Sequence, residues 1–209
     1  GTVLKGALRT ALLYDRWKEG MPEAVTQAYL SGNPSRSATI SLEEKELGSS
    51  GRTPLRMFAV ADSAPVSREK FRVFLTRVSA LSRQQDGRLA LGWKVSPRGA
   101  APPSRVSDST PTFAEMAESG AVFHGVWQEK GQRFDTKVRQ SLGWKEEFSR
   151  QSLFDAANRY ADRLLDLEAK YFEAAGLESL RSGLAGLRKA LEEARLQGAC
   201  LVNLGWDGG

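Results

Sequence analysis

Two basic side chains stand one helical turn apart in GTVLKGALRTALL, the first stretch of the chain. On a helix, Lys5 and Arg9 share one face, so they could reach successive phosphates of a nucleic acid backbone. Thr2 could cap that helix, whose free N–H groups attract anions. The helix dipole disfavours a cation in the first turn, so Lys5 would be better stabilised there if an anion lay nearby. The alternative interpretation is a solvated basic face on an ordinary core helix.

A second candidate site is the glycine-rich stretch NLGWDGG at the other end of the sequence. Closely spaced glycines let a backbone approach a ligand, and a tryptophan among them could stack on a base. The alternative is a tight turn between two strands, with the indole packed inward. The residues concerned are Gly205, Trp206, Gly208 and Gly209.

Other groups that could carry chemistry have weaker support. His124, in AVFHGVWQ, is the only histidine, and no Ser or Cys nucleophile accompanies it in a recognisable motif. This favours a structural or incidental histidine. The Asp-Ser pairs at 62–63 and 108–109 lie near prolines and are typical of turns. Because Cys200 is the only cysteine, neither a disulfide framework nor a thiolate metal site is expected, and no metal or cofactor is predicted.

The charge of the chain is unevenly distributed along its 209 residues. Lys and Arg number 30 against 25 for Asp and Glu, a net charge of +5. Residues 1–140 hold 21 basic and 14 acidic side chains, whereas residues 141–200 hold 9 and 10. The basic excess therefore belongs to the first two thirds and permits a polyanionic partner.

Targeting signals are not evident. The sequence has no run of 18 apolar residues and no signal peptide, which predicts a soluble protein with no membrane partner. A single cysteine fits a reducing, cytoplasmic compartment. The sequence lacks an initiator Met, opens inside a motif and stops after a glycine run, so it is interpreted as a fragment of a longer protein.

Helical periodicity is clearest near the two ends of the sequence. Leucines at i, i+4 and i+8 predict a helix from about Leu4 to Trp17, and a shorter helix is predicted from Pro22 to Gly32. Further along, apolar stripes predict two helices that form a hairpin broken at Gly176. Gly198 is predicted to end the second helix, and CLVNLG then reads as a buried strand.

The middle of the chain predicts strands and loops. Strands are expected at 55–62, 71–81, 89–95 and 121–128, which are rich in β-branched and aromatic residues. Residues 31–54 are dense in Ser, Gly and charge, which predicts a mobile surface loop. The Pro- and Ser-rich segment at 96–112 predicts a flexible protrusion. The predicted fold class is α+β.

Four segments resemble a known family. GTVLKGALRTALL closely resembles the Pro-Gly-Ser-Ser-Leu-Lys-Gly-x-Leu/Ile-Arg motif of the RAMP proteins, the RNA-binding subunits of CRISPR effector complexes. NLGWDGG is similar to the glycine-rich loop near the C-terminal end of the same fold. FAVADSAPVS and FAEMAESGAVFHGVW resemble segments of the subunit at the crRNA 3′ end of type III-A (Csm) complexes. These landmarks occur in matching order over nearly the whole chain.

The resemblance implies a modified ferredoxin-like, RRM-related RAMP fold with a helical insertion and flexible loops. Residues 1–140 would form the RAMP body, with disordered loops near 31–54 and 96–112. Residues 141–198 would be the helical hairpin insertion, and residues 199–209 the returning strand and glycine-rich loop of the same domain.

The resemblance also implies a function, namely a non-catalytic, crRNA-binding end subunit of a cytoplasmic ribonucleoprotein for antiviral defence. It would cap the backbone filament and support maturation of the crRNA 3′ end. Thr2, Lys5 and Arg9 would contact the RNA, together with the glycine loop. The implied partners are crRNA, the target RNA duplex, the backbone RAMP subunit and a small helical subunit. Thr2-Val3 departs from the usual Ser-Ser and keeps one hydroxyl.

Three alternatives stay open at this point. One is a metal-independent crRNA-processing endoribonuclease that uses His124 as acid or base. Another is a repeating backbone RAMP subunit, whose target-cleaving aspartate would lie upstream of the given sequence. The third is a protein-docking scaffold with incidental basic charge.

Overall fold

The computed structural model describes residues 1–16, 43–49, 51–83, 89–95, 103–129, 136–144 and 149–204. The predicted helix from Pro22 to Gly32 lies outside these residues. The chain divides into two compact units. Unit 1 comprises 1–63, 125–166 and 185–209, and unit 2 comprises 64–124 and 167–184. The mixture of helices and small antiparallel sheets agrees with the predicted α+β class.

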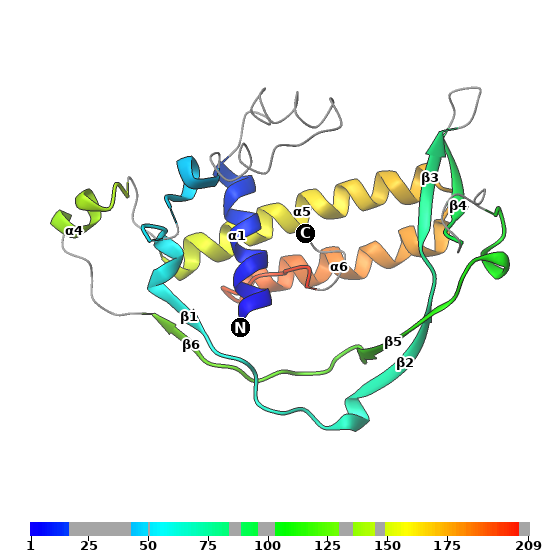
Figure 1. The fold of residues 1–209 in the computed structure, drawn as a ribbon, viewed down its shortest axis with the longest axis horizontal. Coiled ribbons are helices and arrows are strands. Elements are labelled where there is room, and N and C mark those ends of the chain that lie inside the picture. The colour runs from blue at the N-terminus through cyan, green and yellow to red at the C-terminus, as the bar shows by residue number, and fades with distance from the viewer. Residues whose placement is uncertain are drawn as a thin grey trace. The chain divides into compact units, whose positions relative to one another are not determined.

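Unit 1 is organised around helix α1, Thr2–Arg16 (Figure 1). The i, i+4 leucine spacing predicted this helix, and Leu8, Ala11 and Leu12 are its buried residues. The backbone N–H of Lys5 donates to the carbonyl of Gly1 at 3.1 Å, so Gly1 occupies the flanking position at the N-terminus. Thr2 lies inside the first turn, and the prediction that it caps the helix is wrong.

The core of unit 1 joins α1 to segments distant in the sequence. Its other buried members are Leu47, Leu55, Phe58, Leu153, Ala156 and Ala157. Trp127 packs against this cluster, with its ring centroid 5.2 Å from that of Phe58 and 5.7 Å from that of Phe154. The two alanines present little side-chain volume, which allows their helix, α5 (Arg150–Ala174), to approach its neighbours closely.

Part of the predicted 31–54 loop is regular structure. Residues 43–47 are helical, and Leu47 is 2% exposed within the core. A 3-10 helix, η1, covers Pro54–Met57 and buries Pro54 and Leu55. Composition alone predicted a surface loop around Leu47, because its burial depends on α1, which lies far away in the sequence. The strand predicted at 55–62 is regular only at Phe58–Val60, since η1 occupies its start.

The strands form three two-stranded antiparallel sheets among the described residues. In unit 1, β1 (Phe58–Val60) pairs with β6 (Trp127–Glu129). The strand predicted at 121–128 is therefore regular only at its end. Beyond β1, the N–H of Ala61 donates to Val126 O at 3.0 Å, but the following chain carries Pro65, which has no N–H for a ladder.

In unit 2, β2 (Phe71–Thr76) pairs with β5 (Thr112–Ala117), and β3 (Ser79–Arg83) pairs with β4 (Leu89–Trp93). The single strand predicted at 71–81 is thus two strands, and β5 was not predicted. Short 3-10 turns, η2 (Arg68–Lys70) and η3 (Val106–Asp108), flank them. Arg77, between β2 and β3, donates to Ser109 O at 2.6 Å and to Ser109 Oγ at 2.9 Å, and so holds the end of η3.

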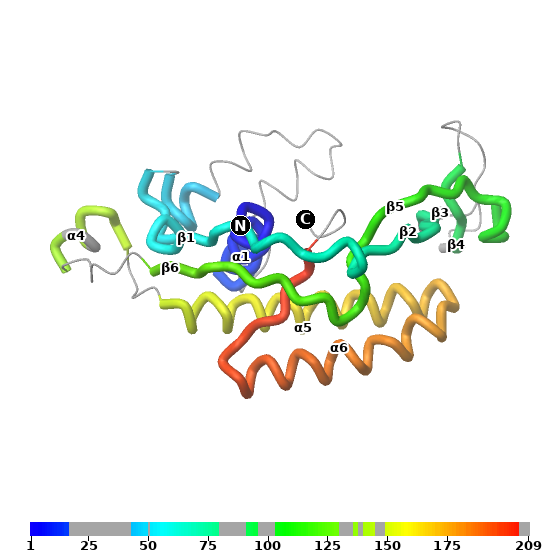
Figure 2. Tube along the Cα trace, turned by 90° about the horizontal axis from the view of Figure 1, so that it is seen from below, coloured from blue at the N-terminus to red at the C-terminus, as the bar shows by residue number. Residues whose placement is uncertain are grey.

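The predicted helices of the last third are present. A short helix, α4, covers Thr136–Ser141, and the long helices are α5 (Arg150–Ala174) and α6 (Glu178–Leu196) (Figure 2). Gly176 and Gly198 follow the long helices with φ of 68° and 63°, a conformation that favours glycine. At each end an N–H reaches back five residues, from Leu177 to Phe172 O and from Ala199 to Ala194 O, both at 2.8 Å.

Ion pairs join α5 and α6 within unit 1. Arg188 lies 2.7 Å from Asp166 and 3.5 Å from Asp162, and Arg195 lies 3.2 Å from Asp162. These side chains are each between about a third and a half exposed, so the pairs stabilise the hairpin only modestly.

The segment after α6 is held by a side chain instead of a strand. Asn158, which is 3% exposed, donates from Nδ2 to Ala199 O at 2.9 Å and accepts from the Leu201 N–H at 2.9 Å. Residues 199–204 form no regular strand, so the predicted returning strand is wrong for this part of the chain. One amide thus supplies the donor and acceptor that a neighbouring strand would otherwise supply.

We expect Asn158→Leu to lower the free energy of unfolding by about 3 kcal/mol, because it leaves two partly buried backbone groups without partners. Asn203→Leu, at an exposed position of the same segment, is the matched control and should change it by less than about 0.5 kcal/mol. Urea unfolding followed by circular dichroism measures both. Equal effects of the two substitutions would contradict a specific role for the Asn158 amide.

Candidate nucleic-acid interface

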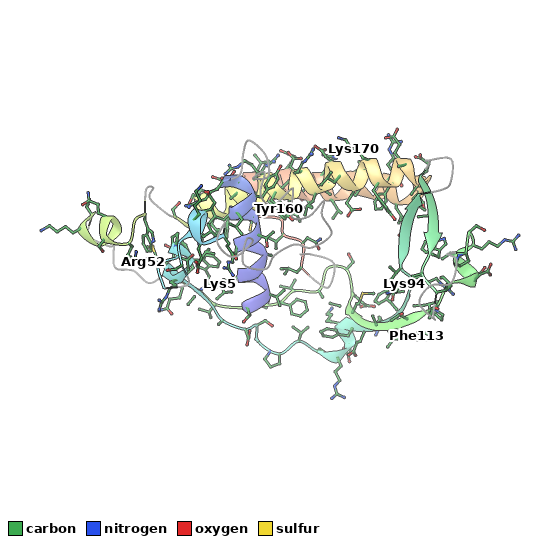
Figure 3. All side chains as sticks on the ribbon, turned by 45° about the horizontal axis from the view of Figure 1, so that its top comes forward. Lys5, Arg52, Lys94, Phe113, Tyr160 and Lys170 are labelled. Atoms are coloured by element: carbon green, nitrogen blue, oxygen red, sulfur yellow. The ribbon has the colours of Figure 1, made fainter. Side chains whose placement is uncertain are left out.

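The predicted basic pair lies on α1 in unit 1, as the spacing required. Thr2 and Arg9 are exposed, and Lys5 is half-buried. Lys5 is one turn before Arg9 on the helix. Figure 3 shows Lys5 near the start of α1. The structure therefore places the two cations on one helix, but it also gives each of them a partner inside the protein.

Lys5 contacts the first strand of unit 1. Its Nζ donates to the carbonyl oxygen of Phe58 at 3.0 Å. This carbonyl explains why a lysine is tolerated in the first turn, where the helix dipole disfavours it. An external anion is therefore not required for its position. An ammonium group has three N–H donors, and the bond to Phe58 O uses one of them. The bond also holds the positive charge of Lys5 next to β1.

Arg9 forms an ion pair with Glu43 through its Nε. The arginine side chain is 52% exposed, whereas that of Glu43 is 23% exposed. The pair joins α1 to the helical residues 43–47 and partly neutralises Arg9. A guanidinium has five N–H donors in a planar fork, so one ion pair through Nε leaves the opposite edge as a separate binding surface.

Gly1 has a steric role at this end of the helix. A Cβ added to it would lie 2.0 Å from Val60 O and 2.9 Å from Val60 C. Both neighbouring atoms belong to the backbone and cannot move aside cheaply. The glycine before α1 thus allows the helix to begin directly against β1, which also brings Lys5 to Phe58.

Sequence reasoning missed two further cations near Lys5. Arg52 and Arg56 lie in and beside η1, which leads directly into Phe58, and both are exposed. Arg56 donates from Nη1 to Gly51 O at 3.1 Å. Figure 3 labels Arg52 at this segment. Their four-residue spacing was a signal, but Arg52 fell in the predicted 31–54 loop and Arg56 in the predicted strand 55–62, so the two were not considered together.

The other half of the predicted site cannot be placed. Gly205, Trp206, Gly208 and Gly209 lie outside the described residues. The segment that leads to them is described as far as Leu204, and Asn158 fixes its beginning. Whether the glycine loop lies beside Lys5 and Arg9 remains a prediction from the family resemblance.

The remaining candidates show no assembled chemistry. His124 is exposed in unit 2, and its carbonyl accepts from the Ala64 N–H at 2.8 Å. Asp108 accepts from the neighbouring Ser107 hydroxyl at 2.9 Å, as expected of a turn residue. Within the described parts of the chain, no group of three or more His, Cys, Asp and Glu side chains is arranged to hold a metal ion.

Cys200 lies half-buried against the core of unit 1. Burial raises the pKa of its thiol from 9.0 to about 11, because a thiolate is poorly solvated there. The thiolate is the reactive form of cysteine, so this position suits packing better than nucleophilic chemistry.

We expect the folded protein to resist alkylation of Cys200 by iodoacetamide below pH 9, with a rate about 100-fold lower than in urea. The raised pKa favours the neutral thiol in the native state. Its contribution to stability is therefore complete below pH 9 and is lost as the pH rises from about 9 to about 11. Intact-mass measurements over time give the rates, and similar rates with and without urea would refute the burial.

Comparison with protein-family models gives no match, and searches of curated proteins and of solved structures give no significant similarity. In the described part of the chain, none of the helices has the length and apolarity needed to cross a membrane.

Proposed function

We propose that the chain is a non-catalytic, RNA-binding subunit of the RAMP superfamily that sits at the crRNA 3′ end of a type III-A CRISPR complex. The observation that carries the proposal is the position of Lys5 and Arg9 one turn apart on α1, with their charges held next to β1 and residues 43–47. The four sequence landmarks of the family support it. The ferredoxin-like arrangement of the sheet is part of the same proposal.

In this proposal, RNA binds through its phosphate backbone. Lys5 and Arg9 each contact a phosphate, and the exposed Thr2 hydroxyl donates a further hydrogen bond. Such contacts carry little base information, which suits a subunit that holds crRNA of varied sequence. Because the cations are anchored to Phe58 O and Glu43, little side-chain entropy is lost when RNA binds.

The proposed partners are crRNA with its target RNA, the backbone RAMP subunit and a small helical subunit. Unit 2 supports the idea of protein contacts, since its β2–β5 sheet leaves Val73, Leu75 and Phe113 more than half exposed. The proposed location is the cytoplasm, where such a ribonucleoprotein would meet foreign transcripts.

We expect Lys5→Glu combined with Arg9→Glu to weaken the salt-dependent binding of a labelled single-stranded RNA. Loss of two phosphate contacts should lower the slope of log K against log salt by about 1.4. Lys170→Glu with Lys189→Glu changes the net charge equally at exposed positions of α5 and α6 and serves as the control. Fluorescence anisotropy at several salt concentrations measures both variants.

Because Lys5 also contacts Phe58, the single variant Arg9→Ala and a thermal melt accompany this test. Arg9→Ala should lower the slope by about 0.7 without unfolding the protein. RNA binding that is equally strong in the wild type and both α1 variants would favour the docking-scaffold alternative.

The proposal assigns no catalytic group, so His124→Ala should leave the length distribution of crRNA unchanged. The imidazole is exposed, and among the described residues no hydrogen bond joins its ring to a nucleophile or a base. The measurement is gel analysis of crRNA from cells that carry the complete complex with wild-type or variant protein. Accumulation of unprocessed crRNA in the variant would support the endoribonuclease alternative.

A further inference from the structure

The β2–β5 sheet of unit 2 has two chemically different faces. Because side chains alternate along a strand, every second residue of β2 shares a face with every second residue of β5. One face, called here the Glu115 face, consists of Phe71, Val73, Leu75, Phe113, Glu115 and Ala117. Phe123 continues it, since its ring centroid lies 6.2 Å from that of Phe71. Apart from Glu115, the side chains of this face are apolar.

The opposite face satisfies its polar side chains within unit 2. Arg72 lies 2.9 Å from the carboxylate of Glu118, so the two charges balance each other. The Thr76 hydroxyl donates to Thr112 O at 2.9 Å. This face therefore asks nothing of a partner in charge or hydrogen bonding, and the Glu115 face differs from it in both respects.

The apolar side chains of the Glu115 face are open to solvent. Val73, Leu75 and Phe113 are each more than half exposed, and Figure 3 labels Phe113 on β5. Of the buried apolar residues in the described chain, only Leu184 belongs to unit 2. A two-stranded sheet is marginally stable by itself, and a contiguous exposed apolar surface is typical of a protein contact. The Glu115 face therefore suits a partner that covers it.

The carboxylate of Glu115 lies in the middle of this apolar surface. Glu115 pairs with Val73, between the pair of Phe71 with Ala117 and the pair of Leu75 with Phe113. Among the described residues, none forms an ion pair or hydrogen bond with the Glu115 side chain. A carboxylate that is covered by a purely apolar partner loses its hydration without compensation. A partner that covers the face therefore needs a cation opposite Glu115.

The same carboxylate disfavours two other occupants. In a symmetric face-to-face dimer, residues at the centre of the contact meet their own copies, so two Glu115 carboxylates would repel each other. Bases of a single-stranded RNA can stack on phenylalanine rings, but the carboxylate repels the phosphates that accompany them. A cationic segment of another protein meets neither obstacle.

The dimensions of the Glu115 face match those of an α-helix. Along β2, the four residue steps from Phe71 to Leu75 cover about 14 Å, which is the rise of about nine helical residues. Two strands side by side are about 10 Å wide, close to the diameter of one helix. An amphipathic helix presents an apolar stripe of this shape.

We propose that the Glu115 face is the docking site for an amphipathic helix of a partner protein, with a Lys or Arg in the middle of the apolar stripe of that helix. Val73, Leu75 and Phe113 pack against the stripe, and the cation pairs with Glu115. The inference goes beyond the proposed function, because it depends on unit 2 and needs neither RNA nor the cations of α1.

The test uses the full chain and two labelled synthetic peptides that differ at one position. Both have leucines at helical spacing, and the centre of the leucine stripe carries Lys in one peptide and Glu in the other. Fluorescence anisotropy should show that the Lys peptide binds at least about 10-fold more tightly than the Glu peptide. Glu115→Lys should reverse this preference. Circular dichroism should show that the Lys peptide gains helix content when it binds.

Leu75→Ser should weaken binding of the Lys peptide at least about 10-fold, because it removes apolar contact area. Leu196→Ser, at an exposed position of α6 in unit 1, is the matched control and should bind like wild type. Thermal melts show whether each variant is folded. Equal affinity of the wild type for the two peptides, or no binding of either, would overturn the proposal.

Two further results would assign the face to another occupant and so overturn the proposal. One is a wild-type dimer in sedimentation equilibrium that Leu75→Ser dissociates, which would indicate a second copy. The other is loss of RNA binding in folded Leu75→Ser protein when the wild type binds neither peptide. The Lys5 and Arg9 variants should bind the Lys peptide like wild type, so this proposal and the proposed function can each fail alone.

Discussion

The buried amide of Asn158 is the constraint on which the arrangement of unit 1 depends. From α5, the amide donates to the Ala199 carbonyl and accepts from the Leu201 N–H, two backbone groups that a neighbouring strand would otherwise bond. A carboxylate of the same shape has no donor for Ala199 O, and an apolar side chain has neither group. Because α5 also supplies Leu153, Ala156 and Ala157 to the core, the amide ties the segment after α6 to the surroundings of α1.

The start of β1 is a second point where several parts of unit 1 meet. Gly1 allows α1 to begin against Val60, and Lys5 then reaches Phe58 O. Arg9 and Glu43 join the next turn of α1 to residues 43–47. Each contact is modest in energy, but together they determine where the positive charges near α1 point. The net charge of the chain does not indicate where these positive charges lie, because several of its arginines are paired with carboxylates along α5 and α6.

Features that depend on nearby residues were predictable from the sequence. The leucines of α1 and the glycines at 176 and 198 act through local geometry, and the structure has the helix and both turns. Strand β5 was missed because Ala, Glu and Met are weak strand formers, and its partner β2 lies about forty residues away. The hydrogen bond from the Trp144 indole to the Arg52 backbone oxygen was not predictable either, because the two residues lie 92 positions apart in the sequence. Of the candidate site, the cations on α1 were predictable, but their internal partners Phe58 and Glu43 were not.

The order of the two units along the chain has a consequence for the entropy of chain closure. Unit 2 consists of two stretches, 64–124 and 167–184, and each leaves unit 1 and returns to it at nearby points. The first departs and returns next to the hydrogen bond between Ala61 and Val126, and the second next to the ion pair between Asp166 and Arg188. Both stretches therefore begin and end at points that are already joined within unit 1. Because their ends are held together, ordering each stretch costs less loop-closure entropy than ordering a chain segment with free ends.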